Sequence, residues 1–360
     1  MLAQRKSRKS VLLTSLLLLS VFALLVAPTA AFAEAVTDYE FASPLFDLAI
    51  APDGSLLVAD AGSGVVKLHH DTGTLVAALP GVAGIVPVGQ EVIWAVTGGG
   101  EGETSGKLFL ITHGKTRLIA DISGFEAEVN PDGGIIDSNP YAVEQTPSGK
   151  ALVVDAGGNS LLMVDRKGKM DWVATFPSQL ASTANFKNLL GCPDAPPEIA
   201  FYCDLPEALP AEAVPTSVVV GPDGAYYVGE LTGFPGAVGI SRVWRIEPGT
   251  LHAECGVSPA CSVVASGFTS VVDLTFGPDG TLYVLEMDEA SFMAIELTFF
   301  GLPGLAQGGT LNACSPVSGS CSEVATDLDI PLAVAVDQHG MIFAAVQALI
   351  PGAAQVVTLP

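Results

Sequence analysis

Acidic residues recur at two fixed distances from a turn in this 360-residue sequence. The turn positions of the five well-matched segments are Gly54, Gly149, Gly224, Gly280 and Gly340. Six residues after the turn, four of the five segments carry a carboxylate, at Asp60, Asp155, Glu230 and Glu286, and the fifth has Val346. Seven residues before it, two segments carry Asp47 and Asp273, where the others have Ala142, Ser217 and Ala333. Such regularity indicates a shared structural role or convergence on one site.

Three interpretations of these carboxylates are open. They could cap strand ends, accept backbone N–H groups and face water. They could hold a cation, most simply calcium, which prefers hard oxygen ligands. A close pair could perform general acid–base catalysis, because two neighbouring carboxyls differ in pKa. The metal ligands under the second interpretation are Asp47, Asn139, Glu230, Asp273 and Glu286, and Asp137, Thr216 and Ser217 are further oxygen donors expected on the same rim.

The turn type decides how closely the two acidic positions approach. With a two-residue loop, the hairpin register places Asp47 opposite Asp60 and Asp273 opposite Glu286, which brings like charges together. A three-residue loop with a glycine bulge shifts the register by one residue, so the two acids of each pair would be near each other but not directly opposite.

Nucleophilic or histidine-based catalysis finds little support. None of the five histidines, at positions 69, 70, 113, 252 and 339, occupies a repeat position on this rim. No G-x-S-x-G motif is present, and TGGGEGETSGK at 97–107 lacks the ending of a phosphate-binding loop. We therefore interpret that stretch as a flexible loop.

The segments that carry the acids are copies of one hairpin. The copies are PLFDLAIAPDGSLLVAD from Pro44, NPYAVEQTPSGKALVVD from Asn139, PTSVVVGPDGAYYVGE from Pro215, SVVDLTFGPDGTLYVLE from Ser270, PLAVAVDQHGMIFAAV from Pro331 and a weaker GIVPVGQEVIWAV from Gly84. Each continues into a third and a fourth alternating stretch, such as SRVWRIEP and CSVVASGF. Six four-stranded units without a helical period predict an all-β, six-bladed β-propeller. A two-sheet sandwich is the competing fold.

The ends of the chain favour a closed ring. The last unit offers three strands, and the stretch EAVTDYEFASPLFDLAI resembles SEVATDLDIPLAVAV, a fourth strand followed by the next unit. We therefore expect the N-terminal strand to complete the last blade, which removes an exposed sheet edge. Insertions at 177–213 and 287–308 are expected on the rim that carries the acids. We interpret FMAIELTFFGLPGL in the second insertion as a packed loop or, alternatively, a partner-binding patch.

Positions 1–33 have the pattern of an export signal: a basic start, an apolar run from Val11 to Val26 and Ala31-Phe32-Ala33 as a cleavage site. We expect a single propeller domain over 34–360, secreted and without a membrane span. Removing four of 15 Lys and Arg leaves 11 against 38 Asp and Glu, a net charge of −27. Nucleic acid is therefore excluded as a partner, and we expect an extracellular ligand, glycan or protein.

Six cysteines in an exported chain indicate disulfides. Fifteen pairings are possible, and the simplest joins sequential neighbours: Cys192–Cys203, Cys255–Cys261 and Cys314–Cys321. The last two would close the connection between the third and fourth strands of their blades, on the face opposite the acidic rim.

The repeat unit resembles NHL-type six-bladed propellers. The stretches DSNPYAVEQTPSGKALVVDAGGNSLLMVD, VPTSVVVGPDGAYYVGELTGFPGAVGISRVWRI and GFTSVVDLTFGPDGTLYVLEM are similar to the ScyD/ScyE family of exported bacterial proteins, over about 44–359. The resemblance implies a six-bladed propeller. The cysteine pairs and the two insertions depart from the family pattern, so a pigment-pathway role does not carry over.

Two functions follow as hypotheses. The first is a secreted, non-enzymatic binding module that uses the acidic rim, with a calcium ion in or near the central channel. The alternative is a calcium-dependent hydrolase similar to six-bladed lactonases, with Glu230 or Glu286, Asn139 and Asp273 around the metal. A quinoprotein-like sugar dehydrogenase is disfavoured, since the rim lacks a histidine and cationic groups are few.

Overall fold

The computed structural model describes residues 35–69, 72–302 and 305–360. The compact unit Ala33–Pro360 contains all of these residues. The predicted export signal, at positions 1–33, lies outside the described part of the chain.

Six antiparallel sheets follow one another along this unit and form a six-bladed β-propeller, as the repeats predict. The first two blades consist of β1 (Leu45–Ile50), β2 (Leu56–Asp60), β3 (Gly64–His69), β4 (Thr72–Ala78), and of β5 (Val82–Gly89), β6 (Val92–Thr97), β7 (Lys107–Thr112), β8 (Lys115–Asp121). The third and fourth consist of β9 (Pro140–Gln145), β10 (Ala151–Asp155), β11 (Ser160–Val164), β12 (Met170–Thr175), and of β15 (Pro215–Val220), β16 (Tyr226–Glu230), β17 (Ser241–Ile246), β19 (Cys261–Phe268). The last two consist of β20 (Val271–Phe276), β21 (Leu282–Glu286), β22 (Gly309–Cys314), β23 (Cys321–Leu328), and of β24 (Ala333–Val336), β25 (Ile342–Val346), β26 (Gln355–Leu359).

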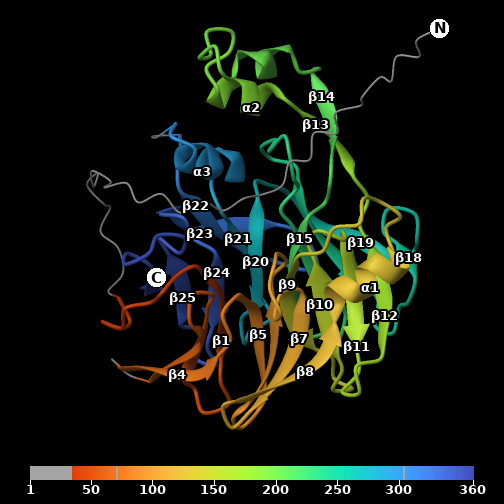
Figure 1. Cartoon of the computed structure of the whole chain (residues 1–360), viewed down its shortest axis with the longest axis vertical. Helices are drawn as coiled ribbons and strands as arrows, with labels where there is room; N and C mark the ends of the chain where they lie inside the picture. Colours follow the sequence, from red (N-terminus) through yellow and green to blue (C-terminus); the bar gives the residue numbers. More distant parts are fainter. Residues whose placement is uncertain (1–34, 70–71, 303–304) are drawn as a thin grey trace, which may run out of the picture. The chain divides into compact units, whose positions relative to one another are not determined.

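The first strand of every blade lies innermost. Strands β1, β5, β9, β15, β20 and β24 each contact the first strands of the two neighbouring blades, and β24 contacts β1 to complete the circle (Figure 1). The second strands are covered on both faces, so that every residue of β2, β10 and β16 is buried. The core therefore lies between the blades.

The N-terminal segment completes the last blade, as predicted, although its pairing is short. Ala35 forms an antiparallel bridge with Val357, and the N–H of Val36 donates to the carbonyl of Val356 at 2.9 Å. Further along, Phe41 is buried within a hydrophobic cluster built from the first and last blades. The chain thus joins its two ends through backbone pairing and apolar packing.

The Pro-Asp-Gly turn has the three-residue form with a glycine bulge. In the first blade, the N–H of Ala51 donates to the carbonyl of Ser55 at 2.8 Å. Gly54 has a φ of 81°, which a residue without Cβ adopts freely. The turn of this blade therefore shifts the register that a two-residue loop would give.

In this shifted register Asp47 pairs with Ala59, and a second bulge, between Leu45 and Asp47, makes Leu45 the partner of Asp60. The fifth blade has the same bulge, and Glu286 pairs with Val271. Direct opposition of Asp47 to Asp60, and of Asp273 to Glu286, is therefore wrong.

Helices occur where the sequence indicated none. Helix α1 (Ile122–Val129) joins the second blade to the third, and α3 (Phe292–Phe299) forms in the stretch interpreted as a packed loop. Four residues of α3 are buried, and its apolar pattern has no polar face from which a helical period could be recognised. None of the helices in the described residues is long and apolar enough to cross a membrane.

The two insertions pack against each other. The first contains β13 (Gln179–Ser182), β14 (Ala208–Ala211), α2 (Ala184–Leu189) and the 3₁₀ helix η1 (Ala200–Asp204). Phe186 and Leu190 from this insertion share a buried cluster with Met293 and Leu297 of α3. The amide of Asn185 donates to the carbonyls of Gly236 and Ala290, at 2.8 and 3.0 Å, so the insertion is also fixed by hydrogen bonds.

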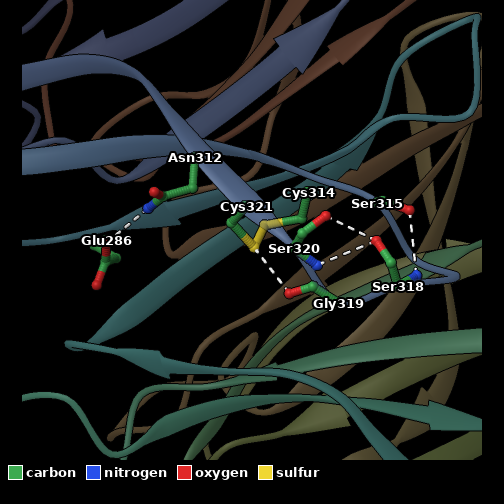
Figure 2. The surroundings of a disulfide bond; sticks show 8 residues. All are labelled: Glu286, Asn312, Cys314, Ser315, Ser318, Gly319, Ser320 and Cys321. Carbon is green, nitrogen blue, oxygen red and sulfur yellow. Dashed lines mark hydrogen bonds between the residues drawn. A yellow bond between two sulfur atoms is a disulfide. The ribbon is translucent and has the colours of Figure 1, made fainter.

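All three disulfides join the predicted partners: Cys192–Cys203, Cys255–Cys261 and Cys314–Cys321. Cys314 ends β22 and Cys321 begins β23, so this bond closes the connection between third and fourth strands (Figure 2). Cys255 follows β18 (Ala253–Glu254), which pairs in parallel with β12 of the preceding blade.

Replacing Phe41 by alanine tests the ring closure. We expect Phe41→Ala to lower the free energy of unfolding by about 3–5 kcal/mol, since a buried aromatic side chain is lost and a cavity remains. Chemical denaturation measures the change. Equal stability of Phe41→Ala and the parent would show that this segment does not hold the ring.

Phe201→Ala is the matched control for this variant. The Phe201 residue is 62% exposed. Its truncation should change the free energy of unfolding by less than about 0.5 kcal/mol, the scale of surface substitutions.

Candidate functional site: the acid-lined channel

A cavity of about 270 Å³ lies at the centre of the propeller. All six innermost strands line it. Its polar side chains are Asp47 from β1, Glu144 from β9, Ser217 from β15, and Asp273 and Thr275 from β20. The described residues that line it include no Lys, Arg or His, so the channel carries acidic groups on an otherwise apolar and small-residue wall.

Asp273 connects three innermost strands. One carboxylate oxygen accepts the Val334 N–H of β24 at 2.8 Å, and the other accepts the Ser217 hydroxyl of β15 at 3.0 Å. The Ser217 hydroxyl oxygen in turn accepts the N–H of Leu274 at 2.9 Å. A carboxylate in this position bonds neighbouring first strands that belong to separate sheets.

Asp47 has the equivalent role two blades further round. Its carboxylate accepts the N–H of Ile85 on β5 at 2.7 Å. Asp47 and Asp273 thus occupy the position seven residues before the turn and face the same cavity.

The channel raises the pKa of all three of its acids. Burial raises the pKa of Asp273 to about 7 despite its hydrogen bonds, and burial also raises the pKa of Glu144 to about 7. The pKa of Asp47 is raised well above its ordinary value by burial and then by the charges of Asp273 and Glu144. The three residues are partly exposed, and all line the cavity. Burial is also the main cause of the raised pKa of Tyr141, to which the charges of Asp273 and Asp47 add.

The acids at the ends of the second strands lie elsewhere, and two of them cap the entry to their own blade. Asp60 accepts the N–H of Ala42 at 2.9 Å and the hydroxyl of Ser63 at 2.8 Å. Asp155 accepts the N–H of Asn139 at 2.7 Å and the Ser138 hydroxyl at 2.6 Å. Both are fully buried, and burial raises the pKa of Asp155. These contacts match the part of the first interpretation in which the acids accept backbone N–H groups, whereas the expectation that they face water is wrong for both.

Glu230 and Glu286 are also buried among donors. Glu230 forms an ion pair with Arg242 and accepts the Trp244 indole N–H at 2.8 Å, and its pKa is nevertheless raised by burial. Glu286 accepts the N–H of Thr269. It also accepts the Asn312 amide at 2.7 Å, as Figure 2 shows, and burial raises its pKa to about 7.

The remaining predicted rim residues divide between loop and blade. Asp137 and Asn139 are exposed, and the Asn139 amide oxygen accepts the N–H of Gly99 at 2.8 Å. Thr216 is buried and donates its hydroxyl to the carbonyl of Val271 at 2.8 Å. Ser217 is the member that joins Asp273 in the channel.

The structure does not bring the five predicted metal ligands together. Asp47 and Asp273 share the channel, whereas Asn139, Glu230 and Glu286 have separate partners near the strand ends. Within the described residues, no three His, Cys, Asp or Glu side chains gather closely enough to hold a metal. The same geometry separates the Glu, Asn and Asp assigned to the lactonase alternative.

Two buried acids, Glu144 and Glu126, do not occupy either of the repeated acidic positions. Glu144 lies five residues before its turn glycine, so only its charge within an innermost strand could have indicated it. The other copies have Ala49, Val219, Thr275 and Ala335 at this position. Glu126 on α1 is 1% exposed, and its pKa is raised to about 7 by burial and by the charges of Asp155, Asp132 and Asp137.

Comparison with known proteins supports the fold. No protein-family model matches the chain, and no curated protein matches it by sequence. Solved structures do match. A gluconolactonase from Xanthomonas campestris is 13% identical with a TM-score of 0.55 and covers 90% of this chain and 89% of its own. The calcium-binding protein regucalcin from Agrobacterium tumefaciens strain C58 is 11% identical with a TM-score of 0.54 and covers 91% of this chain and 95% of its own. A protein of unknown function from Bacteroides thetaiotaomicron is 13% identical with a TM-score of 0.55, covering 91% of this chain and 72% of its own. At these identities the likeness shows the six-bladed propeller fold alone.

Stability should fall as pH rises through the range in which the channel acids ionise. The pKa of Glu144 is about 7 in the fold, against about 4.3 in an unfolded chain. The folded state therefore holds its proton more tightly between these values, and the stabilisation is complete below about pH 4 and lost by about pH 7. We expect Glu144→Gln to flatten this dependence by roughly 1–2 kcal/mol, allowing for water in the channel.

Denaturation midpoints from pH 4 to 8 measure this slope. Asp279→Asn is the matched control, because Asp279 is an exposed turn residue whose pKa is lowered by the N–H and hydroxyl of Thr281. An unchanged slope in Glu144→Gln would contradict the assignment.

Proposed function

We propose that the protein is a binding module that accepts a cationic ligand in its central channel. The observation that carries this proposal is the gathering of Asp47, Glu144 and Asp273 around one cavity of about 270 Å³, among described lining residues without a basic side chain. A site lined by one sign of charge with apolar walls concentrates the opposite charge. A cation therefore suits the channel better than an anion or a neutral apolar molecule.

The volume favours a small ligand. The cavity lies just below the range of about 300–1,000 Å³ for small-molecule pockets, so it suits a metal ion with its waters or a short organic ammonium. Calcium is the metal we favour, since the donors are carboxylate and hydroxyl oxygens. The similar fold of a calcium-binding regucalcin is in keeping with this choice. When bound, calcium would supply positive charge that offsets the repulsion between the channel acids.

The module is proposed to act outside the cell. The signal-like positions 1–33, the acidic composition and three disulfides support export. The resemblance of the blades to the ScyD/ScyE family supports the same placement and names no ligand. A glycan or protein partner on the rim would be a separate interaction.

Calorimetric titration of the mature chain with calcium chloride and, separately, with 1,4-diaminobutane tests the channel. We expect binding of one of these probes to raise the thermal midpoint and to weaken at least about tenfold in Asp273→Asn, because the charge is removed while the side-chain size is kept. Asp279→Asn, in the same hairpin but exposed at its turn, should bind as the parent does. The same number of bound probe ions with the same affinities in Asp273→Asn as in the parent, or no binding of either probe, would refute the channel as a cation site.

Ester or lactone hydrolysis is a second candidate, favoured by the two neighbouring acids. Burial raises the pKa of both Asp47 and Asp273, and the charge of Asp273 raises the pKa of Asp47 further, so one carboxyl can hold a proton while the other is ionised and accepts one from water. The lactonase hypothesis also draws on the fold shared with a gluconolactonase.

Hydrolysis of glucono-1,5-lactone, followed by pH-stat titration with and without calcium, tests this candidate. We expect a rate above the uncatalysed background that falls at least about a hundredfold in Asp273→Asn, the scale typical of losing a general base. Asp279→Asn should keep the parental rate. A rate at background in the parent removes this candidate and leaves the binding module untouched.

A further inference from the structure

A second group of oxygens lies outside the channel, where α1 joins the second blade to the third. In the described residues, four buried side-chain polar atoms lack a hydrogen-bond partner, and three are oxygens of this region: Glu126 Oε1, Asn130 Oδ1 and Ser160 Oγ. The fourth is the indole nitrogen of Trp94. Buried polar atoms are normally satisfied, so these three oxygens require a partner that the described protein groups do not supply, such as a bound water or a cation.

The backbone directs these oxygens to a common place. Glu126 lies on α1, and Asn130 is the C-terminal cap of this helix, with its backbone N–H donating to the carbonyl of Glu126. A Cβ placed on Gly158 would lie 2.8 Å from Glu126 Oε2 and 3.4 Å from Asp155 Cγ, so the two carboxyls flank this glycine. Ser160 pairs with Asp155 across β10 and β11, which places both side chains on the same side of the sheet.

Charge in this region is not balanced by protein groups. Glu126 is almost fully buried and Asp155 is fully buried. Asp155 has its donors, whereas burial and the charges of Asp155, Asp132 and Asp137 all raise the pKa of Glu126. An ionised carboxylate without a counter-charge is costly to bury. The fold therefore places an uncompensated negative charge beside neutral oxygen donors.

We propose that this region binds one calcium ion through the Glu126 and Asp155 carboxylates, the Asn130 amide oxygen and the Ser160 hydroxyl. Calcium takes about six to eight oxygen ligands from carboxylates, amide carbonyls and water, and tolerates irregular geometry. Magnesium demands a stricter octahedron and fits a mixed, buried donor set less well. Only two of the four side chains are acidic, so the site differs from a group of three or more His, Cys, Asp or Glu side chains able to hold a metal, of which the described residues contain none.

A cation here would fix the α1 connection to the third blade. Glu126 and Asn130 belong to the connection from the second blade, and Asp155 and Ser160 to the third. Next to them, the Asn159 amide donates to Asp132 at 3.1 Å, and its oxygen accepts the N–H of Val214 at 3.0 Å, just before the fourth blade. Binding would therefore act on the blade connections and independently of the channel.

Calcium titration in the Asp273→Asn chain isolates this site from the channel. By calorimetry we expect about one calcium per chain, with an affinity that drops at least about tenfold when Glu126→Gln is added, because ligand charge sets the affinity of such sites. Glu128→Gln is the matched control, since Glu128 lies on the same helix and is exposed. Two outcomes would overturn the proposal: undiminished calcium binding in the double variant Asp273→Asn/Glu126→Gln, or no calcium bound by the Asp273→Asn chain.

The parental background gives an independent measurement. With a chelator present, Glu126→Gln should unfold at a higher temperature than the parent, because an unpaired buried charge is removed. With calcium present, the parent should unfold at the higher temperature. Hydrogen exchange should show calcium-dependent protection of residues 122–139 in the parent and in Asp273→Asn. If calcium leaves the order of the midpoints and this exchange unchanged, the oxygens hold only a proton or water and the proposal fails.

Discussion

The packing of six first strands around one axis is the constraint on which the rest of this structure depends. Each first strand touches two others, so the side chains that point inward share one cavity whatever their type. The first strands belong to separate sheets, and the carboxylates of Asp47 and Asp273 accept the N–H groups of Ile85 and Val334 on the neighbouring blades. The same acids that connect the blades therefore place charge in the channel. Structural support and the proposed binding role reside in the same atoms.

The three-residue turn separates two sets of carboxyls that the sequence places in one hairpin. Because this turn pairs Asp47 with Ala59, Asp47 and Asp60 lie on opposite faces of the hairpin; Asp47 lines the channel, and Asp60 is buried elsewhere. Asp60 and Asp155 then accept the N–H groups of the incoming chain, and Glu230 pairs with Arg242. Identical residue types thus acquire separate roles through the face on which they lie.

The helices of this chain lie in the segments that connect its blades or strands, outside the repeated sheets. Helices α2 and α3 pack together through Phe186, Leu190, Met293 and Leu297, and Gln179 of the first insertion donates to Glu230 at 3.1 Å. Helix α1 instead buries Glu126 against the third blade and leaves its oxygen unpaired. Apolar contacts hold the insertions that contain α2 and α3. The α1 connection instead buries a carboxyl that has no positively charged partner among the described residues, and a cation is proposed there for this reason.

The sequence by itself determined the blade count, the order of strands, the ring closure and the three disulfides. These features depend on local patterns: alternation, a Pro-Asp-Gly turn and short cysteine spacings, each of which acts within a few residues. It also identified Asp47, Asp273 and Ser217, because repeats align equivalent positions. Only the tertiary structure decided which acids meet, since a one-residue bulge exchanges the two faces of a strand. Glu144 and Glu126 escaped prediction for a related reason: their importance comes from burial by segments distant in sequence, and α3, apolar on most sides, has no periodic pattern from which its helix could be recognised.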